Sequence, residues 1–141
     1  MKSKNTTFLT KVFTFCAAHK YGNKKWTDKE NWDVFGKDTR VHGHNYTLHV
    51  TVTGDINPDS GFLVDLGHLK KIVNEHVVDV LDHSQFDKDI PWFKGKQPST
   101  EILVVFIWEE IVKHLEGCIL HRIRIEETPT IYTDYYGPTN D

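Results

Sequence analysis

Residues 43–54 show the most regular pattern of hydrophobic and polar positions in the chain. One set of alternate positions is mainly apolar and is formed by His44, Tyr46, Leu48, Val50 and Val52. The positions between them are polar and are occupied by Asn45, Thr47, His49, Thr51 and Thr53. Because successive side chains of a strand point to opposite faces, this period of two predicts a β-strand with one apolar and one polar face.

Three further segments have strand character. Residues 7–19 are rich in Thr, Phe and Val, which favour a pleated backbone. Residues 118–127 alternate again, and one face of the expected strand is formed by Ile119, His121, Ile123, Ile125 and Glu127. The pattern over residues 131–136 predicts a final short strand.

Two segments between these strands have apolar residues at helical spacing. They cover residues 66–80 and residues 99–115. The element order is therefore β-β-α-α-β-β, which predicts an α+β fold with an antiparallel sheet and two helices on one face. One domain over residues 1–141 is expected, because no linker or composition shift divides the chain. The polar face of the strand over residues 43–54 has no cover in this arrangement, so we expect it to assemble with other subunits.

The connection between the first two strands is long and polar. Within it, Thr27 and Glu30 match a capping box and Gly36 is a plausible stop, so a short helix is expected there. A connection of this length in a small domain is usually functional.

Composition and charge exclude several classes of protein. The formal net charge is -3, which argues against a nucleic-acid partner. The two cysteines, Cys16 and Cys118, are too few for a disulfide scaffold, so a reduced, cytoplasmic setting is expected. Lys11 and several threonines interrupt the first apolar stretch, which therefore resembles a strand more than a signal peptide. No apolar segment is long enough to span a membrane.

Three histidines are candidate metal ligands. His42 and His44 are separated by one residue at the start of a strand, so their side chains point to the same, apolar face. His19 ends the first strand, which is expected to pair beside the second. Three imidazoles can hold Zn²⁺ and leave a fourth position for water or substrate, and no fourth protein ligand of the kind that closes a structural zinc site is evident. The alternative is an ordinary core or surface role, which we expect for His49 on the polar face.

Seven short motifs occur in an order that resembles a known enzyme family. They are FCAAH at 15–19, VFGK at 34–37, HGHNY at 42–46, DINPDSG at 55–61, LDH at 81–83, PSTE at 98–101 and EET at 126–128. From about Phe8 to Tyr136 the chain resembles the 6-pyruvoyltetrahydropterin and 6-carboxytetrahydropterin synthase family. The resemblance implies the tunnelling fold (T-fold), in which three subunits close their sheets into a barrel. Two such trimers stack into a hexamer, with the active sites between subunits.

The resemblance also implies roles for individual residues. His19, His42 and His44 match the zinc ligands of the family, so Zn²⁺ is the expected cofactor. Asp82 and His83 match its acid/base pair, and an imidazole can take up and release a proton near neutral pH. In the family reaction zinc polarises the side-chain oxygen of 7,8-dihydroneopterin triphosphate. A base then removes a proton from the adjacent carbon, and triphosphate is eliminated.

Glu127 matches the carboxylate that anchors the pterin ring in the family. A pterin presents a ring N–H beside an amino group, and one carboxylate can accept both as a forked pair. The structural alternative is a salt bridge to Arg122 or Arg124, but these side chains are expected on the opposite face of the strand. Thr100 and Glu101 match a second pterin-contacting stretch, and they are equally compatible with a simple helix start.

One position departs from the family pattern. The catalytic cysteine normally follows the FGK motif, and this chain has Asp38 there. A buried Asp38 can act as the base, or it can favour side-chain cleavage to a 6-hydroxymethyl-dihydropterin. A third alternative is a protein that binds zinc and a pterin without efficient turnover, which the presence of Asp82, His83 and Glu127 together disfavours. Pyruvoyl, carboxy (queuosine-pathway) and hydroxymethyl products all remain compatible with the sequence.

Overall fold

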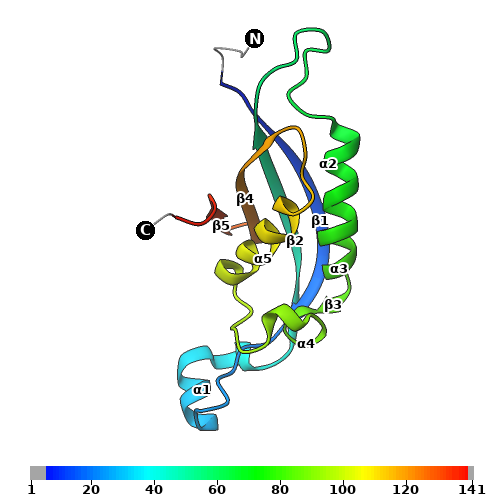
Figure 1. Ribbon diagram of the computed structural model, residues 1–141. Helices are drawn as coiled ribbons and strands as arrows, with labels where there is room; N and C mark the ends of the chain where they lie inside the picture. Colours follow the sequence, from blue (N-terminus) through cyan, green and yellow to red (C-terminus); the bar gives the residue numbers. More distant parts are fainter. Residues whose placement is uncertain (1–5, 140–141) are drawn as a thin grey trace.

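The computed structural model describes residues 6–139. Its centre is a sheet with the strand order β3-β1-β2-β4-β5. The four longer strands are antiparallel to their long neighbours and are β1 (Phe8–His19), β2 (His42–Thr53), β4 (Ile119–Thr128) and β5 (Ile131–Tyr135). Two helices, α2 (Leu66–Val73) and α5 (Thr100–Val112), pack on the apolar face of the sheet (Figure 1). The predicted α+β fold with helices on one face is confirmed.

Some elements differ from the sequence prediction. The helix expected over residues 66–80 consists of α2, a π-helical turn η2 (Asn74–Val78) and a short α3 (Asp79–Leu81). Residues 84–93, for which the pattern predicts no element, form β3 (Ser84–Gln85), α4 (Phe86–Asp89) and the 3-10 helix η3 (Pro91–Phe93). Because β3 pairs parallel to the end of β1, the sheet is not purely antiparallel. Two to four residues are too few to show a period, which is why these elements escape a pattern search.

The loop between β1 and β2 carries the expected short helix, α1 (Asp28–Phe35). Thr27 Oγ1 accepts a hydrogen bond from the Glu30 backbone N–H, and the Glu30 carboxylate accepts one from the Thr27 backbone N–H. This complete capping box fixes the start of the helix. The helix buries none of its own residues and extends past the end of the sheet, where β1 finishes (Figure 1). A 3-10 turn, η1 (Gly36–Thr39), then leads back to β2.

A β-bulge changes the expected facing of β4. The pairing with β2 skips one residue, so Leu120 lies opposite Val52 and Ile119 lies opposite Thr53. Leu120 is therefore buried in the core, whereas Ile119 is 64% exposed. The expectation that Ile119 shares a face with Ile123 is wrong, because the extra residue in a bulge reverses the alternation.

The core lies between the sheet and the helices and forms one cluster. Of the positions predicted for the apolar face of β2, Tyr46, Leu48, Val50 and Val52 are buried in it, whereas the His44 side chain is 20% exposed. Each buried side chain of this size stabilises the fold by about 1.5–3 kcal/mol relative to exposure. Over residues 6–139 every helix is too short or too polar to cross a membrane.

On the opposite face of the sheet, β2 presents polar side chains, as predicted, whereas Phe8 and Val12 of β1 are exposed hydrophobic residues there. Thr10 and Thr51 share a hydrogen bond of 2.7 Å across β1 and β2. On β4 and β5, the Arg124 guanidinium donates two hydrogen bonds to Asp134, at 2.6 and 3.0 Å. The bonds from Arg124 hold the pKa of the Asp134 carboxyl below its ordinary value of 3.8.

Replacing Asp134 with asparagine is expected to lower the free energy of unfolding by about 1 kcal/mol at neutral pH. Since the folded-state pKa of Asp134 is depressed, the ion pair stabilises the fold above the ordinary pKa of 3.8, and this contribution is lost as the pH falls below that value. Denaturant unfolding should therefore separate Asp134→Asn from the parent at neutral pH but not in strong acid. Asp33→Asn, which breaks the exposed pair with Lys29, is the control and should change little. An equal gap at all pH values would contradict the prediction.

Candidate metal centre

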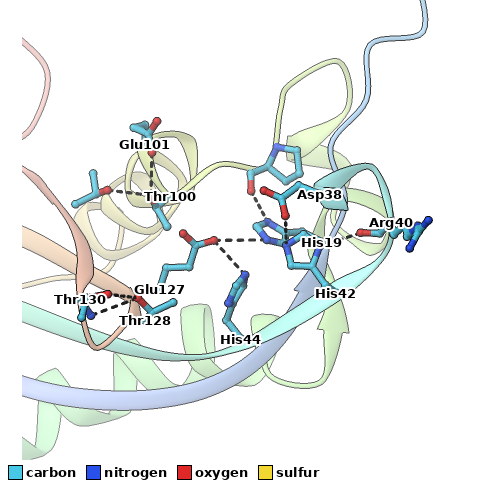
Figure 2. Close-up of polar contacts among 12 residues, drawn as sticks. His19, Asp38, Arg40, His42, His44, Thr100, Glu101, Glu127, Thr128 and Thr130 are labelled. Atoms are coloured by element: carbon cyan, nitrogen blue, oxygen red, sulfur yellow. Dashed lines mark hydrogen bonds and ion pairs between the residues drawn. The ribbon is translucent and has the colours of Figure 1, made fainter. Parts of the chain in front are cut away.

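The pairing of β1 with β2 brings three histidines together at one end of the sheet. The register places His19 opposite His42 and Ala17 opposite His44. The ring centroids of His19 lie 4.6 Å from those of His42 and 5.2 Å from those of His44, and His42 and His44 are 5.1 Å apart. One ring nitrogen of each histidine lies within 4.8 Å of the others. The three imidazoles that the sequence singles out therefore face one point (Figure 2).

Hydrogen bonds to backbone carbonyls fix two of these rings. His19 Nδ1 donates to the Pro98 carbonyl at 2.7 Å, and His42 Nδ1 donates to the Arg40 carbonyl at 2.9 Å. When Nδ1 carries the proton, Nε2 of a neutral imidazole keeps its lone pair, as a metal ligand requires. Pro98 and Arg40 thus orient both rings toward the shared point.

The nitrogens at the centre lack the partners that buried polar atoms normally have. Nε2 of His19 and Nε2 of His44 are both buried without a hydrogen-bond partner among residues 6–139. Burial lowers the pKa of His19; the bond to Pro98 opposes this, and His42 and His44 lower it further. His19 is therefore kept neutral, and the lone pair on its Nε2 has no partner in the described part of the chain. Such orphaned nitrogens are costly without a partner, and a divalent cation supplies one. The residues present fit a zinc ion.

Two carboxylates flank the histidines from different sides. Glu127 Oε1 lies 3.1 Å from His44 Nε2 and 3.7 Å from His19 Nε2, although neither contact has hydrogen-bond geometry. Asp38 Oδ1 lies 3.7 Å from His42 Nε2 (Figure 2). The Glu127 side chain is mostly buried, whereas that of Asp38 is 60% exposed. Within one chain, Asp38 is therefore not the buried carboxylate that the sequence suggests as a base.

The end of β4 explains why Glu127 faces the histidines. Glu127 continues the alternation of Ile123 and Ile125 on the helix-covered face, as the sequence predicts, and the pairing of β4 with β5 skips it. A bulged residue of this kind is a common way to aim a side chain into a site. The alternative partners are engaged elsewhere, since Arg124 binds Asp134 and Arg122 donates to Thr51.

The start of α5 borders the same site. Thr100 is buried, and its hydroxyl lies 2.9 Å from that of Thr133 and donates to Glu101 Oε1 at 2.8 Å. Ser99 caps the helix by accepting from the Ile102 backbone N–H. This segment therefore does serve as the start of α5. Figure 2 shows Thr100 and Glu101 on the Glu127 side of the histidines.

Asp82 and His83 do not join the histidines within one chain. Asp82 accepts a hydrogen bond from the Cys16 backbone N–H at 2.9 Å, and its other oxygen lies 2.9 Å from His83 Nδ1. The bond from Cys16, and then the one from His83, lowers the pKa of Asp82. Over residues 6–139, no hydrogen bond or ion pair links this pair to His19, His42 or His44. The pair lies instead at the edge of β1.

His83 has an unusual conformation for an exposed side chain. Its φ of 62° is in the left-handed region that non-glycine residues seldom occupy, and its side chain is 83% exposed. The His83 backbone N–H is tied to the Cys16 carbonyl at 2.6 Å. Such backbone strain persists only where the surroundings enforce it, and it often marks a functional position.

Two tyrosines near the histidines were not among the predicted site residues. Tyr46 is fully buried, its hydroxyl has no hydrogen-bond partner in the part of the chain that the structure describes, and its ring centroid lies 5.6 Å from that of His44. The Tyr21 ring centroid lies 5.1 Å from that of His19. Burial, and then the charge of Glu127, raises the pKa of both tyrosines, so both keep their protons. Each follows a histidine by two positions, which is the sequence feature that could have identified them.

Comparison with known proteins assigns the family. The model of the family described as 6-pyruvoyl tetrahydropterin synthase matches residues 8–138. The chain belongs to this family. It is 39% identical over 132 residues to 6-pyruvoyl tetrahydrobiopterin synthase of Poecilia reticulata, covering 92% of this chain and 90% of that protein. It is 36% identical over 108 residues to 6-carboxy-5,6,7,8-tetrahydropterin synthase of Bacillus subtilis, covering 71% and 70%.

Solved structures of the family share the architecture. The structure of Caenorhabditis elegans 6-pyruvoyl tetrahydropterin synthase superposes with a TM-score of 0.91 at 33% identity, covering 98% of this chain and 100% of that chain. A variant of the Plasmodium vivax enzyme superposes with a TM-score of 0.68 at 19% identity, covering 96% and 100%, and shares the fold. The chain thus has the T-fold of a family of lyases in pterin biosynthesis.

Proposed function

We propose that this protein is a zinc-dependent lyase that acts on 7,8-dihydroneopterin triphosphate and forms a 6-pyruvoyltetrahydropterin product. The observation that carries the proposal is the meeting of three imidazoles with two orphaned nitrogens beside a partly buried glutamate. In a chain of this family, that arrangement offers a cation site next to a ring-anchoring carboxylate.

His19, His42 and His44 would hold the ion through nitrogens. Zinc bound there would supply a Lewis acid for the side-chain oxygen of the substrate. The backbone carbonyls of Pro98 and Arg40 keep two of the rings in place. Outer partners of this type typically change metal affinity by about 10–100-fold when they are lost.

Glu127 would orient the pterin by accepting its ring N–H and amino group. The Glu127 carboxylate has no arginine or lysine partner in the described part of the chain, so a ligand with two adjacent donors suits it. Thr100 and Glu101, which border this side of the site, would add contacts to the same ring (Figure 2). The protonated hydroxyls of Tyr21 and Tyr46 are further donors nearby.

Proton transfer needs a base, and Asp38 is the candidate within the chain. It is a carboxylate beside His42 in the position of the missing cysteine. In the Plasmodium vivax enzyme a glutamate has been substituted by alanine and by cysteine as the catalytic residue, so a carboxylate serves that role in that protein. Asp82 and His83 would provide the second proton-transfer group. The pair lies at the edge of β1, so in this role it would depend on a neighbouring subunit to bring it to another chain's histidines.

This requirement supports the proposed homo-oligomer, a hexamer of two trimers with shared sites. The uncovered polar face of the sheet would then line the barrel interior. We also propose a cytoplasmic location, in keeping with two unpaired cysteines.

The direct test incubates zinc-loaded protein with 7,8-dihydroneopterin triphosphate and identifies products by mass. A pyruvoyl side chain with released triphosphate supports the proposal. A carboxypterin with acetaldehyde would instead favour the activity named for the Bacillus subtilis relative. A hydroxymethylpterin would indicate side-chain cleavage directed by Asp38, and intact bound substrate would indicate a binding protein.

Asp38→Asn is expected to reduce kcat by about 100- to 10,000-fold if Asp38 is the base, because general-base catalysis contributes on that scale. Asparagine keeps the shape but accepts no proton, so zinc content should stay stoichiometric. Steady-state kinetics and metal analysis of the same preparation check both statements. Asp33→Asn on α1 is the matched control, since the only ion pair of Asp33 within residues 6–139 is the one with Lys29. Unchanged turnover in Asp38→Asn would remove Asp38 from the mechanism.

A further inference from the structure

The position of Glu127 corresponds to a metal ligand as well as to a pterin anchor. Ligands of a tetrahedral zinc ion lie about 2.0–2.2 Å from the metal, which places neighbouring ligand atoms roughly 3.3–3.6 Å apart. Glu127 Oε1 lies 3.1 Å from His44 Nε2 and 3.7 Å from His19 Nε2, so its distances to two of the three histidines bracket that spacing. The group of atoms within 4.8 Å of one another includes His42 but not Glu127, so the carboxylate would have to turn toward His42 to complete the set. Resting on the proposed function, we infer that Glu127 is the fourth metal ligand in the substrate-free protein and that a bound pterin ring displaces it.

The electrostatic surroundings of Glu127 support this inference. The nearby arginines lie on the other face of β4, where Arg122 and Arg124 bind Thr51 and Asp134. A partly buried carboxylate without a cationic partner is costly. The metal relieves this cost when no pterin is present, and the two donors of the pterin relieve it afterwards.

Other oxygen donors fit the fourth position less well. Of the three histidines, only His42 comes within ion-pair distance of Asp38 among the described residues, at 3.7 Å, and Asp38 is largely exposed on a 3-10 turn (Figure 2). Asp82 is held at the edge of β1 by Cys16.

Because Glu127 would contact either the metal ion or the pterin ring, the binding of the metal and the binding of the pterin are coupled. A forked pair with the pterin uses both oxygens of Glu127, so the metal then loses its fourth protein ligand and gains an open position for the substrate side chain. Pterin binding and metal binding should weaken one another by the same factor, since coupling between two binding sites is reciprocal. The metal site would therefore open only when the pterin ring is in place.

The test uses Co²⁺-loaded protein and unsubstituted pterin, which lacks the side-chain oxygens that could bind the ion. Pterin binding is followed independently by fluorescence. Saturating pterin should change the visible absorption of Co²⁺, because Glu127 leaves the ion. Chelator-stripped protein should bind the same pterin more tightly than the Co²⁺-loaded protein. Glu127→Gln should weaken Co²⁺ binding by about tenfold or more without pterin. Glu126→Gln, the matched control, removes the neighbouring carboxylate beside His49 and should retain the parent spectrum.

An unchanged Co²⁺ affinity and spectrum in Glu127→Gln would overturn the inference, as would a parent spectrum that saturating pterin does not alter. Failure of the underlying proposal is distinguishable from either result. In that case His44→Ala would bind Co²⁺ as tightly as the parent, which would show that the three histidines are not the metal site.

Discussion

Replacing His44 with alanine is expected to abolish tight zinc binding and turnover while leaving the fold intact. The change removes one of three protein nitrogens, and even the loss of an outer partner costs about 10–100-fold in metal affinity. We therefore expect affinity to fall by more than about 100-fold. His44 lies at the margin of the core, next to Asn45 and exposed Gly43, so its removal costs little packing. Zinc content after dialysis and competition with a chromophoric chelator measure the effect.

His49→Ala is the matched control for this variant. His49 lies on the same strand, and its side chain is 22% exposed against 20% for His44, but it contacts Glu126 on the polar face. Both variants should unfold at similar denaturant concentrations when metal-free. Only His44→Ala should lose zinc. Stoichiometric zinc in dialysed His44→Ala would mean that the ion, if bound at all, lies elsewhere.

The histidines could be predicted to converge because their placement depends on a regular pattern. The alternation from His44 to Val52 fixes the buried face of β2, and a strand register cannot slip by one residue without exposing that face. His42 and His44 therefore had to point toward the helices. Gly43 completes this arrangement, because a Cβ at that position would come within 3.2 Å of the Ala17 carbonyl oxygen.

The β4 strand shows both the strength and the limit of this reasoning. From Ile123 to Glu127 the alternation is intact, so the facing of Glu127 was predicted correctly. Before Ile123 a bulge shifts the register, and Ile119 faces the opposite way. A bulge is decided by pairing with the neighbouring strand, which a single-strand pattern does not contain.

The secondary structure of residues 82–98 could not be predicted, although parts of this segment support the site. Its elements are too short to show a period. It nevertheless supplies the Pro98 carbonyl that orients His19, the Asp82–His83 pair at the sheet edge, and the ring of Phe86 behind the site. These contacts are made over large sequence separations, and local propensity does not determine them.

Phe86→Ala is expected to lower the free energy of unfolding by about 3–5 kcal/mol, because it empties a fully buried aromatic position. The Phe86 ring lies between three others, with centroids 5.4 Å from His19, 6.3 Å from Tyr46 and 5.0 Å from Phe93. Denaturant unfolding of the metal-free protein measures the loss. Since the cavity would also free the His19 ring, zinc affinity should fall in the same variant.

Two comparisons separate packing from a general effect of losing a phenyl ring. Phe86→Leu keeps most of the volume and should cost less than about 1.5 kcal/mol, with zinc affinity largely retained. Phe62→Ala, at a position that is 67% exposed, should change stability by no more than about 0.5 kcal/mol. If Phe86→Ala were no more destabilising than Phe62→Ala, the packing of α4 against His19 would not contribute to the fold. If Phe86→Ala lost stability but bound zinc normally, the backbone bond to Pro98 alone would hold the His19 ring in its ligating orientation.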